Sequence, residues 1–342
     1  MPYLSVVIRT YTEARWDYLV AAVRSVERQT RPPDEIVIVA DHNPALAARV
    51  RDALSPRAIE PTGAGTRPEV VAVENLEAVG LSGAGNSGVR AARGEILVFI
   101  DDDATAAPDW LEQLERGYRD PRVMGVGGAI LPVWESGRPG WFPDEFAWVV
   151  GCSYRGLPEV EASVRNLIGC NMSFRRAAFQ AAGGFRGAES GIGRVGALPM
   201  GCEETEFAIR LRQQSPDGIL LHRPRAQVFH QVPAKRTSWR YFLSRCYFEG
   251  RSKARVAQLV GSRDGLQSER AHALRTLPRG VAAGVRDFAV GRDAGGLAKA
   301  AAIVVGLAWT TAGYLVETFA NRRAPRPPAV IRPSRVTGDQ LR

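Results

Sequence analysis

The stretch Glu95–Asp103 places the strongest constraint on how this chain can fold. It reads Glu-Ile-Leu-Val-Phe-Ile-Asp-Asp-Asp, so five apolar residues run directly into three carboxylates. A short run rich in Ile, Val and Phe that is bounded by polar residues predicts a strand buried on both faces. In an open α/β sheet, ligands bind beyond the carboxyl ends of such strands. We therefore expect Asp101 and Asp103 to stand at the rim of a crevice.

The three adjacent carboxylates also predict a cation site. Neighbouring carboxylates repel one another, and a hard cation with oxygen ligands removes that repulsion. Mg²⁺ or Mn²⁺ commonly uses one or two carboxylates together with the phosphates of a substrate. The alternative is a solvated acidic turn, but the buried run that precedes the triplet favours a site.

The residues before this strand alternate between strand and helix patterns. Predicted strands are Leu4–Arg9, Glu35–Ala40 and Val70–Val73. Predicted helices are Tyr18–Gln29 and Pro44–Leu54, and a glycine-rich turn, Gly80–Gly88, enters a third helix that runs through Ala92. Strands that alternate with helices in this way predict an α/β fold with a mainly parallel, doubly wound sheet.

Further elements follow the acidic triplet. They are a helix at Pro108–Arg119, strands at Val123–Ile130 and Gly169–Arg175, a helix at Glu203–Gln214, and two short closing strands at Ile219–His222 and Ala226–Val232. Glu203–Gln214 opens with Glu203, Glu204 and Glu206. Acidic residues in a first turn are favourable with the helix dipole, which by itself explains any one of them.

The charge is divided unevenly along the 342 residues. Residues 1–234 hold 25 Lys and Arg against 29 Asp and Glu, a net charge of −4. Residues 235–342 hold 20 against 7, a net charge of +13, which together give the formal +9 of the whole chain. A basic region of this kind favours nucleic acid, anionic lipid or phosphorylated ligands as partners. No nucleic-acid recognition motif is present, so we expect no nucleic-acid partner.

The basic region is predicted to be helical, with helices at Trp239–Val260 and Ser268–Leu277. Ala300–Val316 contains no charged residue, and its 17 residues would span about 26 Å as a helix, just short of a bilayer core. It is a marginal transmembrane helix, an interfacial helix or a buried core helix. We therefore divide the chain into an α/β domain at 1–235, a basic helical region at 236–323 that is a candidate for membrane association, and a disordered tail at 324–342.

The cysteines and the N-terminus indicate the compartment. The four cysteines are widely spaced and form no Cys-x-x-Cys pair, which argues against a zinc site and fits a reducing compartment. Met1-Pro2 leads directly into a strand, without an apolar signal-like segment. We expect a cytoplasmic protein that works at the inner face of the cell membrane.

Four motifs occur in an order that resembles a known family. They are Ser5–Tyr11 at the first strand, the segment from Gly80 through Asn86-Ser87-Gly88 to Arg93-Gly94-Glu95, the triplet Asp101–Asp103, and Gly201–Leu211. In this respect the chain is similar to the inverting family 2 glycosyltransferases with the GT-A fold, over about Leu4–Val232. The resemblance implies a mixed, mainly parallel sheet flanked by helices, here followed by a C-terminal helical extension.

The resemblance also implies roles for individual residues. The nucleotide-sugar contacts would be Thr10, Tyr11, Glu13, Asp41, Asn86, Asp101 and Asp102. The metal, Mg²⁺ or Mn²⁺, would be held by Asp103, Asp101 and His230. The family usually has Glu-Asp where this chain has Glu203-Glu204, so Glu204 matches the catalytic base and Glu203 is the runner-up.

The reaction implied is transfer of a sugar from a nucleotide-diphosphate donor to a hydroxyl of a lipid-linked or saccharide acceptor, in polysaccharide or glycolipid biosynthesis. One alternative is a sugar-phosphate nucleotidyltransferase, which would have a glycine- and Lys/Arg-rich loop after the first strand; Thr10–Arg15 lacks that glycine. Another is a noncatalytic membrane-bound scaffold, which the intact acidic motifs disfavour.

Overall fold

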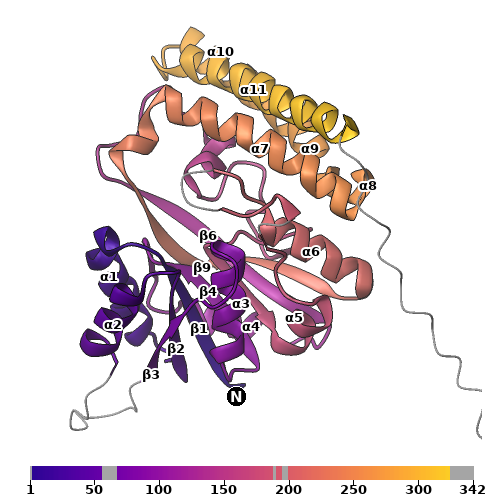
Figure 1. Cartoon of the computed structure of the whole chain (residues 1–342). Coiled ribbons are helices and arrows are strands. Elements are labelled where there is room, and N and C mark those ends of the chain that lie inside the picture. Colours follow the sequence, from indigo (N-terminus) through magenta and orange to yellow (C-terminus); the bar gives the residue numbers. More distant parts are fainter. Residues whose placement is uncertain (1, 56–67, 188–189, 195–198, 324–342) are drawn as a thin grey trace, which may run out of the picture.

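A computed structural model describes residues 2–55, 68–187, 190–194 and 199–323, and all structural statements concern these residues (Figure 1). The predicted tail at 324–342 lies outside them. One mixed sheet of nine strands runs in the order β3-β2-β1-β4-β8-β6-β9-β5, with β7 paired to β9. The strands are β1 Leu4–Thr10, β2 Glu35–Ala40, β3 Glu69–Glu74, β4 Ile96–Asp101, β5 Ala104–Ala106, β6 Val123–Trp134, β7 Ala162–Ser163, β8 Asn171–Arg175 and β9 Ile219–Val232.

Helices cover both faces of this sheet. They are α1 Trp16–Glu27, α2 Pro44–Ala53, α3 Leu81–Ala91, α4 Trp110–Gly117, α5 Arg176–Ala182 and α6 Glu203–Gln214. The C-terminal region adds α7 Trp239–Val260, α8 Ser262–Gly265, α9 Gln267–Ala271, α10 Leu277–Ala289 and α11 Gly296–Arg323. The predicted mixed α/β architecture with a C-terminal helical extension is confirmed.

The first four strands of the sheet order, β3, β2, β1 and β4, pair in parallel. Strands β1 and β2 are buried at every position, and β4 is buried up to Ile100, as a two-sided apolar run requires. One apolar cluster packs α1, α2 and α4 on one face, and a second packs α3, α5 and α6 on the other. Each fully buried Val, Leu or Ile contributes about 1.5–3 kcal/mol. The ends of β1 and β4 are therefore fixed rigidly.

The second part of the sheet is largely antiparallel. β8 pairs antiparallel with both β4 and β6, whereas β6 and β9 run parallel. The two predicted closing strands form a single strand, β9, because the interruption is only a register shift opposite Gly128 and Ala129. This continuity carries the chain back across the sheet and places His230 beside β5.

The glycine-rich segment is a helix rather than the predicted turn. Gly80, at φ 119°, precedes α3, and the remaining glycines lie inside that helix. A Cβ on Gly88 would lie 2.5 Å from Cγ1 of Val7, and one on Gly83 would overlap the carbonyl oxygen of Ala78. The glycines therefore serve to bring α3 close to the sheet.

The C-terminal helices form a layer on the side of the molecule opposite the N-terminus (Figure 1). α7 has the predicted bounds, whereas the predicted helix Ser268–Leu277 is divided into α9, a π-helical turn at His272–Thr276 and the start of α10. Ala300–Val316 lies within α11, which packs on α7 so closely that a Cβ on Gly250 or Gly313 would overlap backbone of the other helix. Glu317 of α11 is buried and pairs with Arg251 at 2.7 Å.

Candidate active site

A cavity of about 1120 Å³ opens at the carboxyl ends of β1 and β4. It is lined by nine of the eleven predicted site residues: Thr10, Tyr11, Asp41, Asp101, Asp102, Asp103, Glu203, Glu204 and His230. The cavity also reaches the C-terminal layer, since residues of α7, α10 and α11 form part of its wall. The fold therefore brings together segments that are more than two hundred residues apart in the sequence.

Two predicted residues, Glu13 and Asn86, do not line the cavity. Glu13 is exposed and pairs with Arg49 at 3.1 Å. Asn86 on α3 accepts from the backbone N–H of Phe185 and donates to its carbonyl, at 2.9 Å each. The role that the structure gives Asn86 is to hold the segment before α6 against α3.

Asp41 and Tyr11 form the outer part of the cavity. Asp41 accepts from Nδ2 of Asn75 at 2.6 Å and from the backbone N–H of Gly80 at 2.9 Å, so it fixes the entry to α3. Tyr11 is 52% exposed, and the guanidinium of Arg15 lies 5.3 Å from its ring centroid. An exposed ring at a cavity rim offers a stacking surface for a planar ligand.

Asp101 and Asp102 each lie against an arginine. Arg9 Nη2 lies 3.0 Å from Oδ1 of Asp101, whose side chain is partly exposed. Asp102 is buried, with Arg15 Nη1 and Thr10 Oγ1 each donating to it at 2.8 Å. Burial raises the pKa of Asp102 to about 6, against the opposing effect of Arg15.

Asp103 lies among three basic side chains. Arg15 Nη2 is 3.2 Å from its carboxylate, His230 Nε2 is 3.3 Å away and Arg236 Nη2 is 3.5 Å away. Burial alone would raise the pKa of Asp103, but His230, Arg15 and Arg236 together hold that pKa below its usual range. Asp103 is therefore ionised throughout the physiological pH range.

Glu203 and Glu204 begin α6 on another wall of the cavity. The preceding Cys202 has a left-handed backbone at φ 74°, which is uncommon for a residue with a side chain and marks strain at this turn. Burial raises the pKa of Glu203. Burial and then the Glu203 carboxylate raise the pKa of Glu204 to about 8. Among the described residues, no cation forms an ion pair with either carboxylate.

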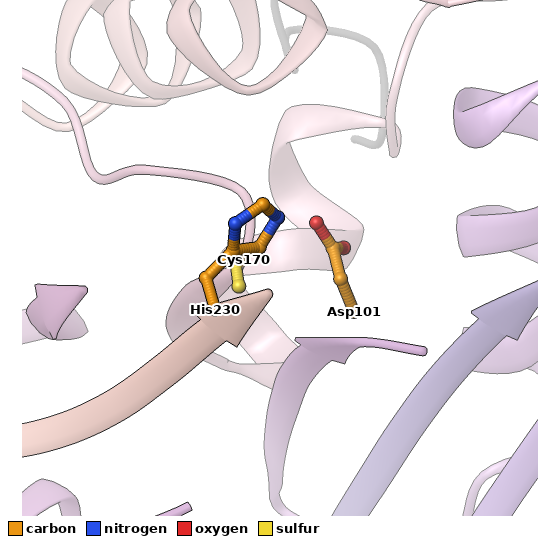
Figure 2. Close-up of side chains that lie close together, drawn as sticks. All are labelled: Asp101, Cys170 and His230. Atoms are coloured by element: carbon orange, nitrogen blue, oxygen red, sulfur yellow. The ribbon is translucent and has the colours of Figure 1, made fainter. Parts of the chain in front are cut away.

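Asp101, Cys170 and His230, which all line the cavity, lie close together (Figure 2). Each offers one ligand atom, and these atoms lie within 4.8 Å of one another. Carboxylate oxygens and an imidazole nitrogen suit a divalent ion such as Mn²⁺ or Mg²⁺. Cys170 suits softer ions, and burial raises the pKa of its thiol well above the usual range. The residues present, with Asp103 beside His230, thus fit a divalent cation.

Several cavity residues were not predicted from the sequence. Arg9 and Arg15 lie in or next to the first motif and could have been found there, because a carboxylate triplet needs cations. Arg236 and Lys253 carry no motif. Lys253 on α7 pairs with Glu269 at 2.9 Å and with Glu249 at 3.3 Å. Only the folded chain brings these residues beside the acidic groups.

The fold is that of the GT-A glycosyltransferases. The solved structure of the mannosyltransferase PcManGT from Pyrobaculum calidifontis, in complex with GDP-Man and Mn²⁺, superposes with a TM-score of 0.55 at 20% identity, over 94% of this chain and 86% of that one. GalNAc-T7 with UDP, GalNAc and Mn²⁺ gives 0.51 at 17% identity, over 80% of this chain and 54% of that one. At these identities the likeness concerns the fold.

Sequence comparison shows the family. The profile described as Glycosyl transferase family 2 matches residues 5–183. The glucosyl-dolichyl phosphate glucuronosyltransferase of Haloferax volcanii is 35% identical over 258 residues, which are 75% of this chain and 78% of that protein. The chain belongs to glycosyltransferase family 2 and is a glycosyltransferase, as the motifs predicted. The nucleotidyltransferase and scaffold alternatives are set aside.

Proposed function

We propose that the protein is a metal-dependent, inverting glycosyltransferase that moves a sugar from a nucleotide-diphosphate donor to a hydroxyl of a lipid-linked acceptor. The observation that carries this proposal is the meeting of two acidic clusters, Asp101–Asp103 and Glu203-Glu204, in one cavity. One cluster is suited to a cation and an anionic leaving group. The other offers a basic carboxylate for the acceptor.

The donor is assigned to the Asp101–Asp103 end of the cavity. Arg15 and Arg236 lie there within 3.5 Å of Asp103, and their guanidinium groups match the oxygens of a diphosphate. A divalent ion held by Asp101, Asp103 and His230 would offset the charge that develops on the leaving diphosphate. The similar GT-A structures were solved with nucleotide ligands and Mn²⁺, which supports this assignment.

Glu204 is assigned as the general base. A pKa of about 8 makes its ionised form a stronger proton acceptor than an ordinary carboxylate, and it is still populated near neutral pH. It takes the proton of the acceptor hydroxyl as that oxygen attacks the anomeric carbon. A base on one side and the leaving group on the other give a single displacement with inversion, by the geometry that applies to sugar transfer in general.

The acceptor assignment rests on the relative and on α11. The Haloferax relative is named for a glucosyl-dolichyl phosphate substrate, a sugar on a lipid phosphate. Gly296–Ala320 of α11 is the one helical stretch among the described residues that is long and apolar enough to cross a membrane. Its mean hydropathy is 1.4, and 33% of its most apolar 18 residues is buried. Its outward face exposes Leu297, Val304, Val305, Trp309, Leu315, Val316 and Phe319.

We assign this outward face of α11 to the surface of a membrane rather than to a span. The inner face is bound to α7 through Gly313 and through the ion pair of Glu317 with Arg251, so α11 stays beside the catalytic domain. An apolar face this long marks an interaction surface, and an interfacial helix inserts such a face between lipid headgroups. Each Lys or Arg that lies near an anionic surface would add about 1 kcal/mol.

Turnover and membrane binding are tested separately. Nucleotide sugars are screened with Mn²⁺, Mg²⁺ and EDTA for acceptor-dependent release of nucleotide, and NMR gives the anomeric configuration of the product. Retention of configuration would exclude inversion, and full activity in EDTA would exclude the metal.

For the membrane, Trp309→Ser should weaken flotation with anionic vesicles, whereas Val160→Ser, at an exposed site away from α11, should not. Equal flotation of wild type and Trp309→Ser would contradict the assignment of this face.

A further inference from the structure

The π-helical turn His272–Thr276 forms an unusual part of the cavity wall. It joins α9 to α10 and arises where Pro278 follows, because Pro278 has no N–H to donate to the carbonyl of Leu274 and so interrupts the α-helical ladder. π-helical turns are rare and occur frequently at functional sites. His272, Arg275 and Thr276 all line the cavity.

Three arginines on this wall lack counter-ions. Arg270, Arg275 and Arg279 line the cavity and are exposed, and none forms an ion pair or a side-chain hydrogen bond with a described residue. The cavity arginines near the acidic clusters differ: Arg9 pairs with Asp101, and Arg15 with Asp102. The wall formed by residues 270–279 is therefore a concentration of uncompensated positive charge that opens into the catalytic cavity.

His272 adds polar atoms that the protein itself does not fully satisfy. Both of its ring nitrogens are enclosed and lack a hydrogen-bond partner of ordinary length and angle among the described residues, and the backbone of Glu145 makes only a weaker polar contact with the ring. The ring is held edge-on against Tyr154, with centroids 5.2 Å apart. Gly156, at φ 116°, leaves room for it, because a Cβ there would lie 3.0 Å from Nδ1 of His272. An unpaired buried polar group is costly, so a ligand that supplies the partner would be stabilised.

The wall is also anchored and partly apolar. Glu269 of α9 pairs with Arg165 at 2.5 Å and with Lys253 of α7 at 2.9 Å, which ties the segment to the rest of the cavity. Leu266, Leu277 and Leu307 line the same region. Positive charge next to leucine side chains matches an anionic group carried on a hydrocarbon chain.

We propose that Arg270, Arg275, Arg279 and His272 bind the phosphate of the acceptor, a prenyl-type lipid phosphate, while the acceptor hydroxyl lies at Glu204. Guanidinium groups bind phosphate oxygens in a bidentate manner, and the imidazole supplies a further hydrogen bond. This inference rests on the proposed function, and it assigns the phosphate to a wall separate from the donor diphosphate. The acceptor is thus recognised by its phosphate and not only by its sugar.

The test uses the full-length protein with a glycosylated short-chain prenyl monophosphate as acceptor, in detergent. Arg275→Ala combined with Arg279→Ala should raise the acceptor KM about tenfold or more, because two charge-assisted contacts are lost. The affinity for the nucleoside diphosphate product, measured by calorimetry, should change less than about twofold. The matched control is Arg286→Ala: Arg286 lies on the same helix, pairs with Asp287 and does not line the cavity, so the acceptor KM should not change.

Three outcomes would overturn the proposal. The first is an unchanged acceptor KM in the double variant. The second is an equal rise in KM for a phosphate-free prenyl glycoside, since these arginines would then not be recognising the phosphate. The third is a loss of binding to anionic vesicles with a normal KM in detergent, which would assign the arginines to membrane headgroups. Direct calorimetric binding of the prenyl monophosphate needs no turnover, so it tests this wall even if no nucleotide sugar supports transfer.

Discussion

The two acidic clusters of the cavity have similar formal charge but opposite surroundings. Asp103 lies within 3.5 Å of Arg15, Arg236 and His230, and its pKa is held below the usual range. Burial and the neighbouring Glu203 raise the pKa of Glu204 to about 8, and Glu204 forms no ion pair with a described residue. When the surroundings of two carboxylates push their pKa values apart, the two groups can take different roles in acid–base chemistry. Asp103 therefore stays charged over the working pH range, whereas Glu204 can exchange a proton.

The largest effect is expected from removing the carboxylate that accepts the proton of the acceptor hydroxyl. Glu204→Gln keeps the shape of the side chain but cannot accept a proton, so kcat should fall by about 10²–10⁴-fold while the donor affinity changes little. Steady-state kinetics combined with calorimetric binding of the nucleoside diphosphate measure both quantities.

Two variants serve as controls for this prediction. Glu203→Gln should reduce kcat less than Glu204→Gln, because Glu203 is more enclosed, with 4% of its surface exposed. Glu204→Asp restores the Glu-Asp pair that is usual in the family and should retain more activity than the amide. If Glu203→Gln gives the larger loss, the roles of the two residues must be exchanged.

The next effect concerns Asp103, which stays charged. Asp103→Asn removes the charge that balances Arg15, Arg236 and His230, so metal-dependent binding of the nucleoside diphosphate should weaken by about 10–100-fold. Calorimetry with and without Mn²⁺ measures this, and fluorescence or circular dichroism checks the fold. Metal-dependent binding and turnover at the wild-type level would contradict the assignment of Asp103 to the metal.

A smaller effect should appear in the pH profile. Because the pKa of Glu204 is about 8, kcat/KM should rise about tenfold per pH unit between pH 6 and 8, above the pKa of Asp102, and then level off. Asp103 contributes nothing to this slope, since it stays ionised over the same range. The residual activity of Glu204→Gln should lack the slope. A wild-type profile that is flat between pH 6 and 8 would show that the proton acceptor is another group.

Sequence patterns were sufficient to predict the parallel strands and to locate the acidic motifs, because an apolar run such as Ile96–Ile100 has few alternatives to a buried strand. They were insufficient where the packing of distant segments determines the local structure or the role of a residue. The glycines of α3 indicated a turn, yet they lie in a helix, where Gly88 lets the helix pack against Val7. Asn86 matched a motif position but binds the backbone of Phe185. The arginines at 270–279 gave no signal, because only the fold shows that they face the cavity without counter-ions.

The smallest effect is on stability, and its sign differs between the clusters. Glu204 has a folded-state pKa of about 8 against an ordinary value of 4.5, so between these values the folded state holds a proton that the unfolded chain has lost. Stability of the wild type therefore falls as the pH rises through this window. Glu204→Gln escapes that cost, so its Tm should equal the wild-type Tm near pH 4.5 and exceed it by about 2 °C or more at pH 8.5.

The lowered pKa of Asp103 gives stability that is present above the unfolded-state pKa and lost in acid, so Asp103→Asn should lower Tm at pH 8.5. Thermal denaturation of both variants at the two pH values tests the comparison directly. A Tm that falls in both variants at pH 8.5 would mean that Glu204 is stabilised as an anion, and that the two clusters are electrostatically alike.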